Sequence, residues 1–218
     1  MSIENNLQAV LKSIPIHVTL VAVTKTKSVD EILTAYNAGQ RDFGENKIQE
    51  MTAKYELLPK DIRWHMIGHL QSNKVKYMAA YVHLIHGIDK FSTLKEIDKQ
   101  AKKHNRIINC LLQVYIAEEE TKYGFDQDEI VALLESPEFK NLQNVNIIGL
   151  MGMATFTDNE HQIRKEFKLL ARFYHKLQAV YPNFKCLSMG MSSDYLIAID
   201  EGSTLIRVGS AIFGERYL

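Results

Sequence analysis

Lys25 is the residue of this sequence whose type and position best suit covalent chemistry. It ends the segment HVTLVAVTK (17–25), in which strand alternation places Val21, Val23 and Lys25 on one face. If that face points into a barrel, the amine sits among apolar walls. Desolvation there disfavours the ammonium form and makes the amine a better nucleophile toward an aldehyde. The predicted chemistry at Lys25 is therefore formation of a Schiff base.

Lys27 is the nearest alternative nucleophile. It has the same parity as Lys25 but lies next to Ser28, the expected cap of a following helix, where the chain has already turned toward solvent. This argument favours Lys25. A second alternative treats both lysines as ordinary surface charges at a strand end, because lysine side chains usually extend toward water from such positions.

Two segments late in the sequence combine small residues with hydroxyl groups. They are MGMSSD (189–194) and RVGSAIFG (207–214), which belong to the last two expected strands and the turns after them. In a barrel, these turns often bind phosphate through backbone N–H groups and the start of a short helix. Ser192, Gly209 and Ser210 are therefore the candidate phosphate contacts, although a lone Gly-Ser pair is also typical of a simple tight turn.

Arg207 stands in LIRVG, where its apolar neighbours indicate a buried strand. A buried arginine needs a partner, because its charge is costly to remove from water. A bound ligand or a carboxylate of the same protein would each meet this need, and the sequence leaves both open.

Histidines in two short motifs raise the question of a metal site. They are His65 and His69 in WHMIGH, and His83 and His86 in HLIH. Their spacings suit helices better than strands, strand alternation separates His83 from His86, and no carboxylate or cysteine completes a recognisable ligand set. We therefore predict no metal site, and we interpret His65 as a hydrogen-bonded structural residue.

The elements that must position these residues are short β-rich segments that alternate with helical stretches, without a Pro-, Gly- or Ser-rich linker. This pattern predicts an α/β fold, a single-domain TIM-like (β/α)8 barrel over residues 1–218, with an extra N-terminal helix at about residues 2–13. An open doubly wound sheet is the alternative, but its usual glycine-rich turn is missing from VTKTKSVDE. The expected strands are HVTLVAVTK (17–25), RDFGEN (41–46), IRWHMIG (62–68), VHLIHGID (82–89), INCLLQVYI (108–116), VNIIGLMGMA (145–154), CLSMGMS (186–192) and LIRVGSAIFG (205–214).

Ser, Thr or Asp followed three residues later by Glu marks the expected start of several helices. These capping pairs predict turns after the first, fourth, fifth and sixth strands. All of these turns then lie at the end of the barrel where active sites of this architecture are found. The pairs are Ser28/Glu31, Thr93/Glu96, Asp126/Glu129 and Thr157/Glu160.

The charge balance argues against nucleic acid or a membrane as a partner. The 218 residues contain 26 Lys and Arg against 26 Asp and Glu, so no overall field would gather a polyanion or an anionic lipid surface. Cys110 and Cys186 lie in apolar segments without CxxC spacing and are expected to be reduced core residues. No long apolar run suits a signal peptide or a membrane span, so we expect a cytoplasmic protein.

The motifs that carry a resemblance to a known family are, in order, VAVTKTK, FGENKIQE, WHMIGHLQSNK, GLMGMA, LSMGMSSD and GSTLIRVGSAIFGER. Together they closely resemble the pyridoxal phosphate homeostasis protein family over nearly the whole chain. The resemblance implies a barrel like the amino-terminal domain of alanine racemases. It also implies that pyridoxal 5′-phosphate (PLP) is held as a Schiff base on Lys25.

The resemblance further implies which other residues contact the cofactor. Asn46 is expected near it, Ser192, Gly209 and Ser210 at its phosphate, and Arg207 beside its pyridine nitrogen. Relatives have threonine where this chain has Ser210, so the hydroxyl group is kept.

The expected chemistry is limited in two ways. A guanidinium group donates hydrogen bonds but cannot accept one, so Arg207 would keep the pyridine nitrogen unprotonated and make the ring a weaker electron sink. The sequence also ends at Leu218, without the β domain that gives alanine racemases dimer contacts and a second base. We therefore expect a monomeric cofactor carrier rather than an efficient enzyme, with PLP-dependent apoenzymes as partners. A weak racemase and a class I aldolase, in which Lys25 attacks a sugar-phosphate carbonyl, remain the alternatives.

Overall fold

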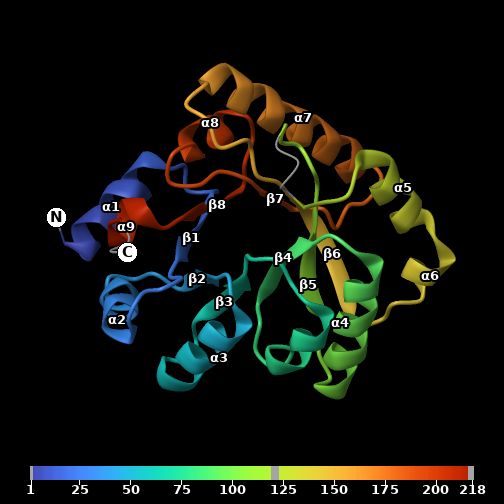
Figure 1. Ribbon diagram of the computed structural model, residues 1–218, viewed down its shortest axis with the longest axis horizontal. Coiled ribbons are helices and arrows are strands. Elements are labelled where there is room, and N and C mark those ends of the chain that lie inside the picture. The colour runs from blue at the N-terminus through green and yellow to red at the C-terminus, as the bar shows by residue number, and fades with distance from the viewer. Residues whose placement is uncertain (1, 119–122, 216–218) are drawn as a thin grey trace.

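The computed structural model describes residues 2–118 and 123–215, so Leu218 lies outside the described residues. The strands are parallel and close into a barrel in sequence order, with β8 hydrogen-bonded to β1. Figure 1 shows the helices around the outside of the strands, which confirms the predicted TIM-like barrel. The strands are β1 (Thr19–Val23), β2 (Asp42–Glu45), β3 (Arg63–Met66), β4 (Leu84–Ile88), β5 (Ile108–Gln113), β6 (Val145–Met151), β7 (Cys186–Ser188) and β8 (Leu205–Val208).

At least one helix follows each strand, and the predicted N-terminal helix α1 precedes the barrel. Ser2 caps α1 by accepting the N–H of Asn5. Helix α1 lies beside α9 (Figure 1), where the amide of Asn6 donates to the carbonyl oxygen of Ile212 at 3.0 Å. The helices are α1 (Ile3–Ser13), α2 (Val29–Asn37), α3 (Ile48–Leu57), the 3₁₀ helix η1 (Ser72–Tyr77), α4 (Phe91–Lys103), α5 (Gln127–Glu135), α6 (Pro137–Lys140), α7 (Glu160–Gln178), α8 (Tyr195–Asp200) and α9 (Ser210–Phe213).

Several strands end earlier than the apolar pattern predicted. Strand β1 stops at Val23, so Lys25 lies in the turn after the strand, and Thr26 has a positive φ of 65° that no strand accommodates. The last expected strand divides in the same way, because the chain leaves β8 after Val208 and Gly209 caps α9. In both cases the sequence pattern of a strand continues beyond the last residue that belongs to the sheet.

Two of the predicted capping pairs are confirmed and two are wrong. Ser28/Glu31 and Asp126/Glu129 form complete capping boxes. Helix α4 instead begins at Phe91 after Lys90, which leaves Thr93 buried inside the first turn, and α7 begins after Asn159, whose side chain accepts the N–H of Gln162. The structure therefore starts these two helices at other residues than the Ser/Thr-x-x-Glu pattern indicated.

The barrel interior has an apolar part and a polar part. Val21 packs inside the barrel while Ala22 packs against the surrounding helices, which confirms the predicted alternation of β1. Cys110 and Cys186 are free and buried, as expected. The interior apolar residues are Val21, Leu84, Leu111, Met151, Cys186 and Leu205. The buried polar residues of the inward-facing positions include Asp42, His65, His86, Ser188 and Arg207.

No helix within residues 2–118 and 123–215 is both long enough and apolar enough to cross a membrane.

Candidate functional site

A cavity of about 960 Å³ opens at the carboxyl-terminal end of the strands. Its walls come mainly from residues that end strands or follow them, so the barrel itself gathers them at one end. Each site residue expected from the sequence lines this cavity: Lys25, Asn46, Ser192, Arg207, Gly209 and Ser210. Their roles as cofactor contacts stay predictions.

The turn that carries Lys25 is held on both sides by hydrogen bonds from α3. The backbone N–H of Thr26 donates to Glu50 Oε1 at 2.6 Å. Lys54 Nζ donates to the backbone oxygen of Thr24 and to Glu50 Oε1, each at 2.7 Å. These bonds fix the backbone immediately before and after Lys25, so they limit the directions that its side chain can take.

Lys54 belongs to a buried ion cluster under this turn. Its ammonium also contacts Glu45 Oε1 at 2.7 Å, and the hydroxyl of Thr24 donates to the same oxygen at 2.6 Å. Burial raises the pKa of Glu45, and the hydrogen bonds from Lys54 and Thr24 oppose the shift. Glu45 Oε2 is buried and has no hydrogen-bond partner within the described part of the chain. A cluster of this kind is costly to bury, so its position beneath Lys25 indicates a role in holding that turn.

Lys27 differs from its expected position. The sequence predicted that it faces solvent, but its side chain is only 13% exposed and also lines the cavity. Its Nζ donates to the carbonyl oxygen of Phe213 at 3.0 Å and pairs with Glu31 Oε1 at 3.3 Å, one helical turn away. Both contacts hold the Lys27 amine against protein atoms.

The turn after β7 contacts the turn after β8 through Ser192. Its hydroxyl oxygen accepts the N–H groups of Gly209 at 3.1 Å and of Ala211 at 3.5 Å. A Cβ atom on Gly209 would meet Val23 Cβ at 3.3 Å, closer than most such contacts, so a larger residue would push this turn away from β1. The hydroxyl groups of Ser192 and Ser210 and the backbone of Gly209 thus lie on one side of the cavity, which suits a phosphate group.

Arg207 borders the cavity from β8 and is 4% exposed. Its guanidinium donates to Ser188 Oγ at 2.6 Å, to the carbonyl oxygen of Ser188 at 3.0 Å and to that of Gly152 at 3.2 Å. Burial lowers the pKa of Arg207 to about 10, against the opposing charge of Asp194. The group remains charged near neutral pH and is held by neutral acceptors on Ser188, at the end of β7, and on Gly152, directly after β6.

His69 and Asp89 form a pair that the sequence analysis did not assign to the site. His69 lines the cavity, and its Nδ1 lies 3.1 Å from Oδ2 of Asp89, whose side chain is 4% exposed. The imidazole also stacks on the ring of Tyr123 at 4.5 Å. The signal was present, because both residues follow the ends of neighbouring strands. The motif WHMIGH indicated His69 only as a candidate metal ligand.

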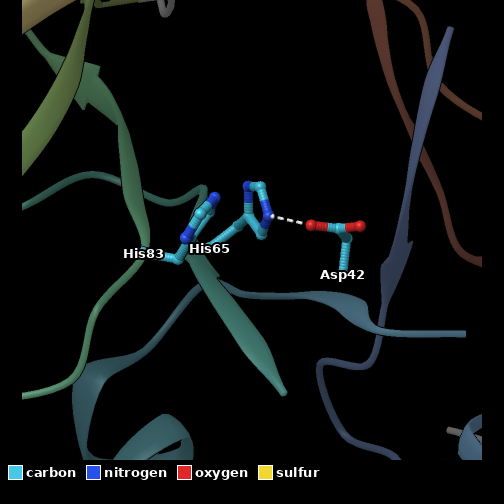
Figure 2. Close-up of side chains that lie close together, drawn as sticks. All are labelled: Asp42, His65 and His83. Carbon is cyan, nitrogen blue, oxygen red and sulfur yellow. Dashed lines mark hydrogen bonds and ion pairs between the residues drawn. The ribbon is translucent and has the colours of Figure 1, made fainter. Parts of the chain in front are cut away.

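His65, which the sequence indicated as a structural residue, lies beside His83 and a carboxylate from outside both histidine motifs. Asp42, His65 and His83 bring one possible ligand atom each within 4.8 Å of one another (Figure 2). The expectation that no carboxylate accompanies these histidines is therefore wrong. Asp42 was missed because it belongs to β2, outside both histidine motifs. Arg63 donates to both oxygens of Asp42, at 2.7 and 2.5 Å, and so already neutralises this carboxylate. The absence of a metal stays a prediction.

Comparison with known proteins gives the family of the chain. The family model for the alanine racemase N-terminal domain matches residues 1–217. The pyridoxal phosphate homeostasis protein of Aquifex aeolicus is 40% identical over 199 residues, covering 90% of this chain and 86% of its relative. The protein of that name from Synechocystis sp. is 38% identical over 212 residues, covering 95% of each chain.

Solved structures agree with this assignment. PipY of Synechococcus elongatus, solved with PLP bound, superposes with a TM-score of 0.88 at 36% identity, covering 98% of this chain and all 100% of PipY. An alanine racemase of Clostridium difficile superposes with a TM-score of 0.77 at 12% identity, covering 100% of this chain and 56% of the racemase, which shows a shared fold. The chain therefore belongs to the pyridoxal phosphate homeostasis protein family, whose barrel is that of the alanine racemase N-terminal domain.

Proposed function

We propose that this protein binds PLP as a Schiff base on Lys25 and acts in intracellular vitamin B6 homeostasis without efficient catalysis. The observation that carries the proposal is that Lys25, Arg207 and the Ser192 turn line one cavity. An amine, a ring-nitrogen donor and a group of phosphate donors are the chemistry that the different parts of PLP require. The names of the relatives and the PLP-bound PipY structure support PLP binding and a role in PLP homeostasis.

The residues present fit the cofactor. Ser192, Gly209 and Ser210 would hold the phosphate, Arg207 would donate to the pyridine nitrogen, and Asn46 would line the ring. When bound, PLP supplies an aldehyde that reacts with amines and a ring that withdraws electrons. Lys25 provides the amine, and the bonds to Thr24 and Thr26 hold its turn in place.

Arg207 supports a carrier rather than an efficient enzyme. Because its guanidinium can only donate, it favours an unprotonated pyridine nitrogen and weakens the electron-withdrawing power of the ring. Abstraction of a proton from a bound amino acid is then less favourable than it would be with a carboxylate partner. Reversible storage of the aldehyde on Lys25 does not need a strongly electron-withdrawing ring.

A weak amino-acid racemase is the second candidate function, and one observation favours it. His69, oriented by Asp89, lines the same cavity as Lys25 and has the chemistry of a general acid or base. An imidazole there would give a bound amino acid a proton acceptor besides the lysine.

The test of the proposed function is the absorption spectrum of purified protein and of two lysine variants. The expected result is a yellow protein whose colour is lost in Lys25→Ala and kept in Lys27→Ala. Colour that persists after loss of Lys25 would contradict the assignment. Borohydride reduction and mass spectrometry separate the aldolase alternative, because a pyridoxyl adduct on Lys25 supports PLP and a sugar adduct supports an aldolase.

The setting of this function is proposed as well. A cytoplasmic, monomeric carrier would limit the free aldehyde available to cellular amines and pass PLP to apoenzymes that need it. Size-exclusion chromatography with light scattering measures the oligomeric state. Transfer of PLP to a purified apoenzyme measures delivery.

A further inference from the structure

Buried polar side chains form a continuous chain of contacts through the barrel interior, starting at the cavity. Arg207 Nη1 lies 2.6 Å from Ser188 Oγ, and Ser188 Oγ lies 2.9 Å from His86 Nδ1. His86 Nε2 then lies 3.0 Å from His65 Nδ1, and His65 Nε2 lies 3.0 Å from Asp42 Oδ1. Figure 2 shows the last of these contacts, with the imidazole of His65 directed at the carboxylate of Asp42.

The chain of contacts crosses the barrel from one end to the other. Arg207 lines the cavity, and Ser188 is the last residue of β7. Asp42 is instead the first residue of β2, at the amino-terminal end of the strands. Branched apolar side chains usually fill this space in such barrels. Apolar replacements for buried polar groups are often no less stable, so stability alone is a weak explanation of this arrangement.

Donor chemistry gives the chain of contacts a single direction. A guanidinium only donates, so Ser188 Oγ accepts from Arg207 and its own hydrogen is available to His86 Nδ1. His86 Nδ1 then accepts, which leaves the ring hydrogen on Nε2 to be donated to His65 Nδ1. His65 in turn carries its hydrogen on Nε2 and donates it to Asp42. In this assignment both histidines carry the ring hydrogen on Nε2, which is the same tautomer.

The charges at the two ends agree with this direction. Burial disfavours the charged form of His86 and lowers its pKa well below 6.5, and the neighbouring His65 and Arg207 act the same way. Although burial raises the pKa of Asp42, hydrogen bonds from Arg63 and His65 lower it overall, so the carboxylate is ionised. A cation at one end and an anion at the other polarise every hydrogen bond between them in the same sense.

We propose that Ser188, His86, His65 and Asp42 form a one-way hydrogen-bond relay that holds Arg207 in its donating orientation toward the ring of the bound cofactor. His86 and His65 are positioning residues in this relay. The link to the cofactor rests on the proposed function, whereas the direction of the relay does not. Protonation of His86 at Nδ1 removes the acceptor for Ser188 and so releases the serine hydroxyl from its fixed orientation.

Other charged and titratable groups face the relay from the packed elements around it. Arg63 on β3 pairs with Asp42, and the ring of His83 lies 5.4 Å from that of His65. Cys186 on β7 and Asp194, which caps α8, act on Arg207. His83 supplies a matched control, because it lies beside the relay without being part of it.

The first test reads the tautomers directly in protein labelled with ¹⁵N-histidine, prepared without PLP and with a chelator present. The expected ¹⁵N spectrum at neutral pH shows His65 and His86 as neutral rings with the hydrogen on Nε2. A spectrum in which either ring carries its hydrogen on Nδ1, or is an imidazolium, would overturn the proposed direction. This measurement needs only the wild-type protein, so it holds even if a variant fails to fold.

The second test links the relay to the cofactor. Ser188→Ala and His86→Leu should weaken PLP binding about tenfold and shift the absorption band of the bound form, whereas His83→Leu should change neither. His86→Gln, which keeps a donor at the position of Nε2, should recover part of the loss. An unchanged band and affinity in both Ser188→Ala and His86→Leu would overturn the positioning role. Failure of borohydride to trap PLP on Lys25 in the wild type would instead contradict the proposed function.

Discussion

The backbone N–H of Thr26 donates to Glu50 at 2.6 Å, which fixes the residue after Lys25 in a left-handed conformation with φ of 65°. A β-branched residue adopts this conformation only where surrounding contacts compensate the strain. Lys54 supplies those contacts, because it binds Glu50 and the carbonyl oxygen of Thr24 together. The shape of the lysine turn is therefore determined by a side chain of α3.

Lys54→Met should destabilise the protein strongly. The substitution leaves Glu45 buried without its cation, and breaking a buried pair in this way costs about 3–5 kcal/mol. Urea denaturation monitored by circular dichroism measures the change. Lys99→Met is the matched control, because Lys99 pairs with Glu96 at 3.5 Å on the surface with 63% of its side chain exposed, and its loss should cost about 0.5 kcal/mol or less. Equal effects in the two variants would contradict a special role for Lys54.

Stability should fall as the pH drops below 6.5, with His86 as a main contributor. The folded-state pKa of His86 lies well below its ordinary 6.5 because of burial, so the unfolded chain binds a proton that the folded protein does not. Stability contributed by the neutral ring is therefore present above 6.5 and is lost as pH falls, by about 1.4 kcal/mol per pH unit for one group.

Unfolding free energies measured between pH 6.5 and 5 in wild type and His86→Gln test this expectation. In His86→Gln the slope of the unfolding free energy against pH should fall by nearly the contribution of one bound proton. A variant at the exposed His161 serves as the control for removal of a histidine elsewhere. The chosen window lies above 3.8, the ordinary pKa of Asp42, whose folded-state value is lowered and which therefore matters only at more acidic pH. Equal slopes in wild type and His86→Gln would show that His86 is not the titrating group.

Ser192→Ala should weaken binding of PLP more than binding of pyridoxal. The hydroxyl oxygen of Ser192 accepts the N–H groups of Gly209 and Ala211, and its own hydrogen can donate to a ligand with a phosphate. We expect about a tenfold loss of PLP affinity and less than a threefold change for pyridoxal, measured by fluorescence titration. A similar loss of affinity for both ligands would show that the phosphate does not bind at this turn.

Purified PLP-loaded protein should not invert chiral amino acids faster than free PLP does. The donating partner of the pyridine nitrogen, Arg207, disfavours proton abstraction. Chiral chromatography over a panel of amino acids measures inversion. Turnover proportional to protein and lost in both His69→Gln and Asp89→Asn would instead establish the second candidate function, with the His69–Asp89 pair as its base.

Local residue patterns predicted the alternation of β1, the capping boxes at Ser28 and Asp126 and the (β/α)8 order. These features depend on neighbours within a few residues, so period and residue type are enough to predict them. The choice of Lys25 also came from local parity. Strand ends and the caps of α4 and α7 were less predictable, because neighbouring elements compete to set them.

The surroundings of Arg207 and Lys25 come instead from residues that are far apart in the sequence. Ser188 and His86 are 102 positions apart, and Lys54 reaches the carbonyl oxygen of Thr24 across 30. Such contacts depend on barrel closure and strand register, which no local pattern encodes. The sequence therefore predicted the lysine, whereas the closed barrel determined the relay behind Arg207 and the ion cluster beneath Lys25.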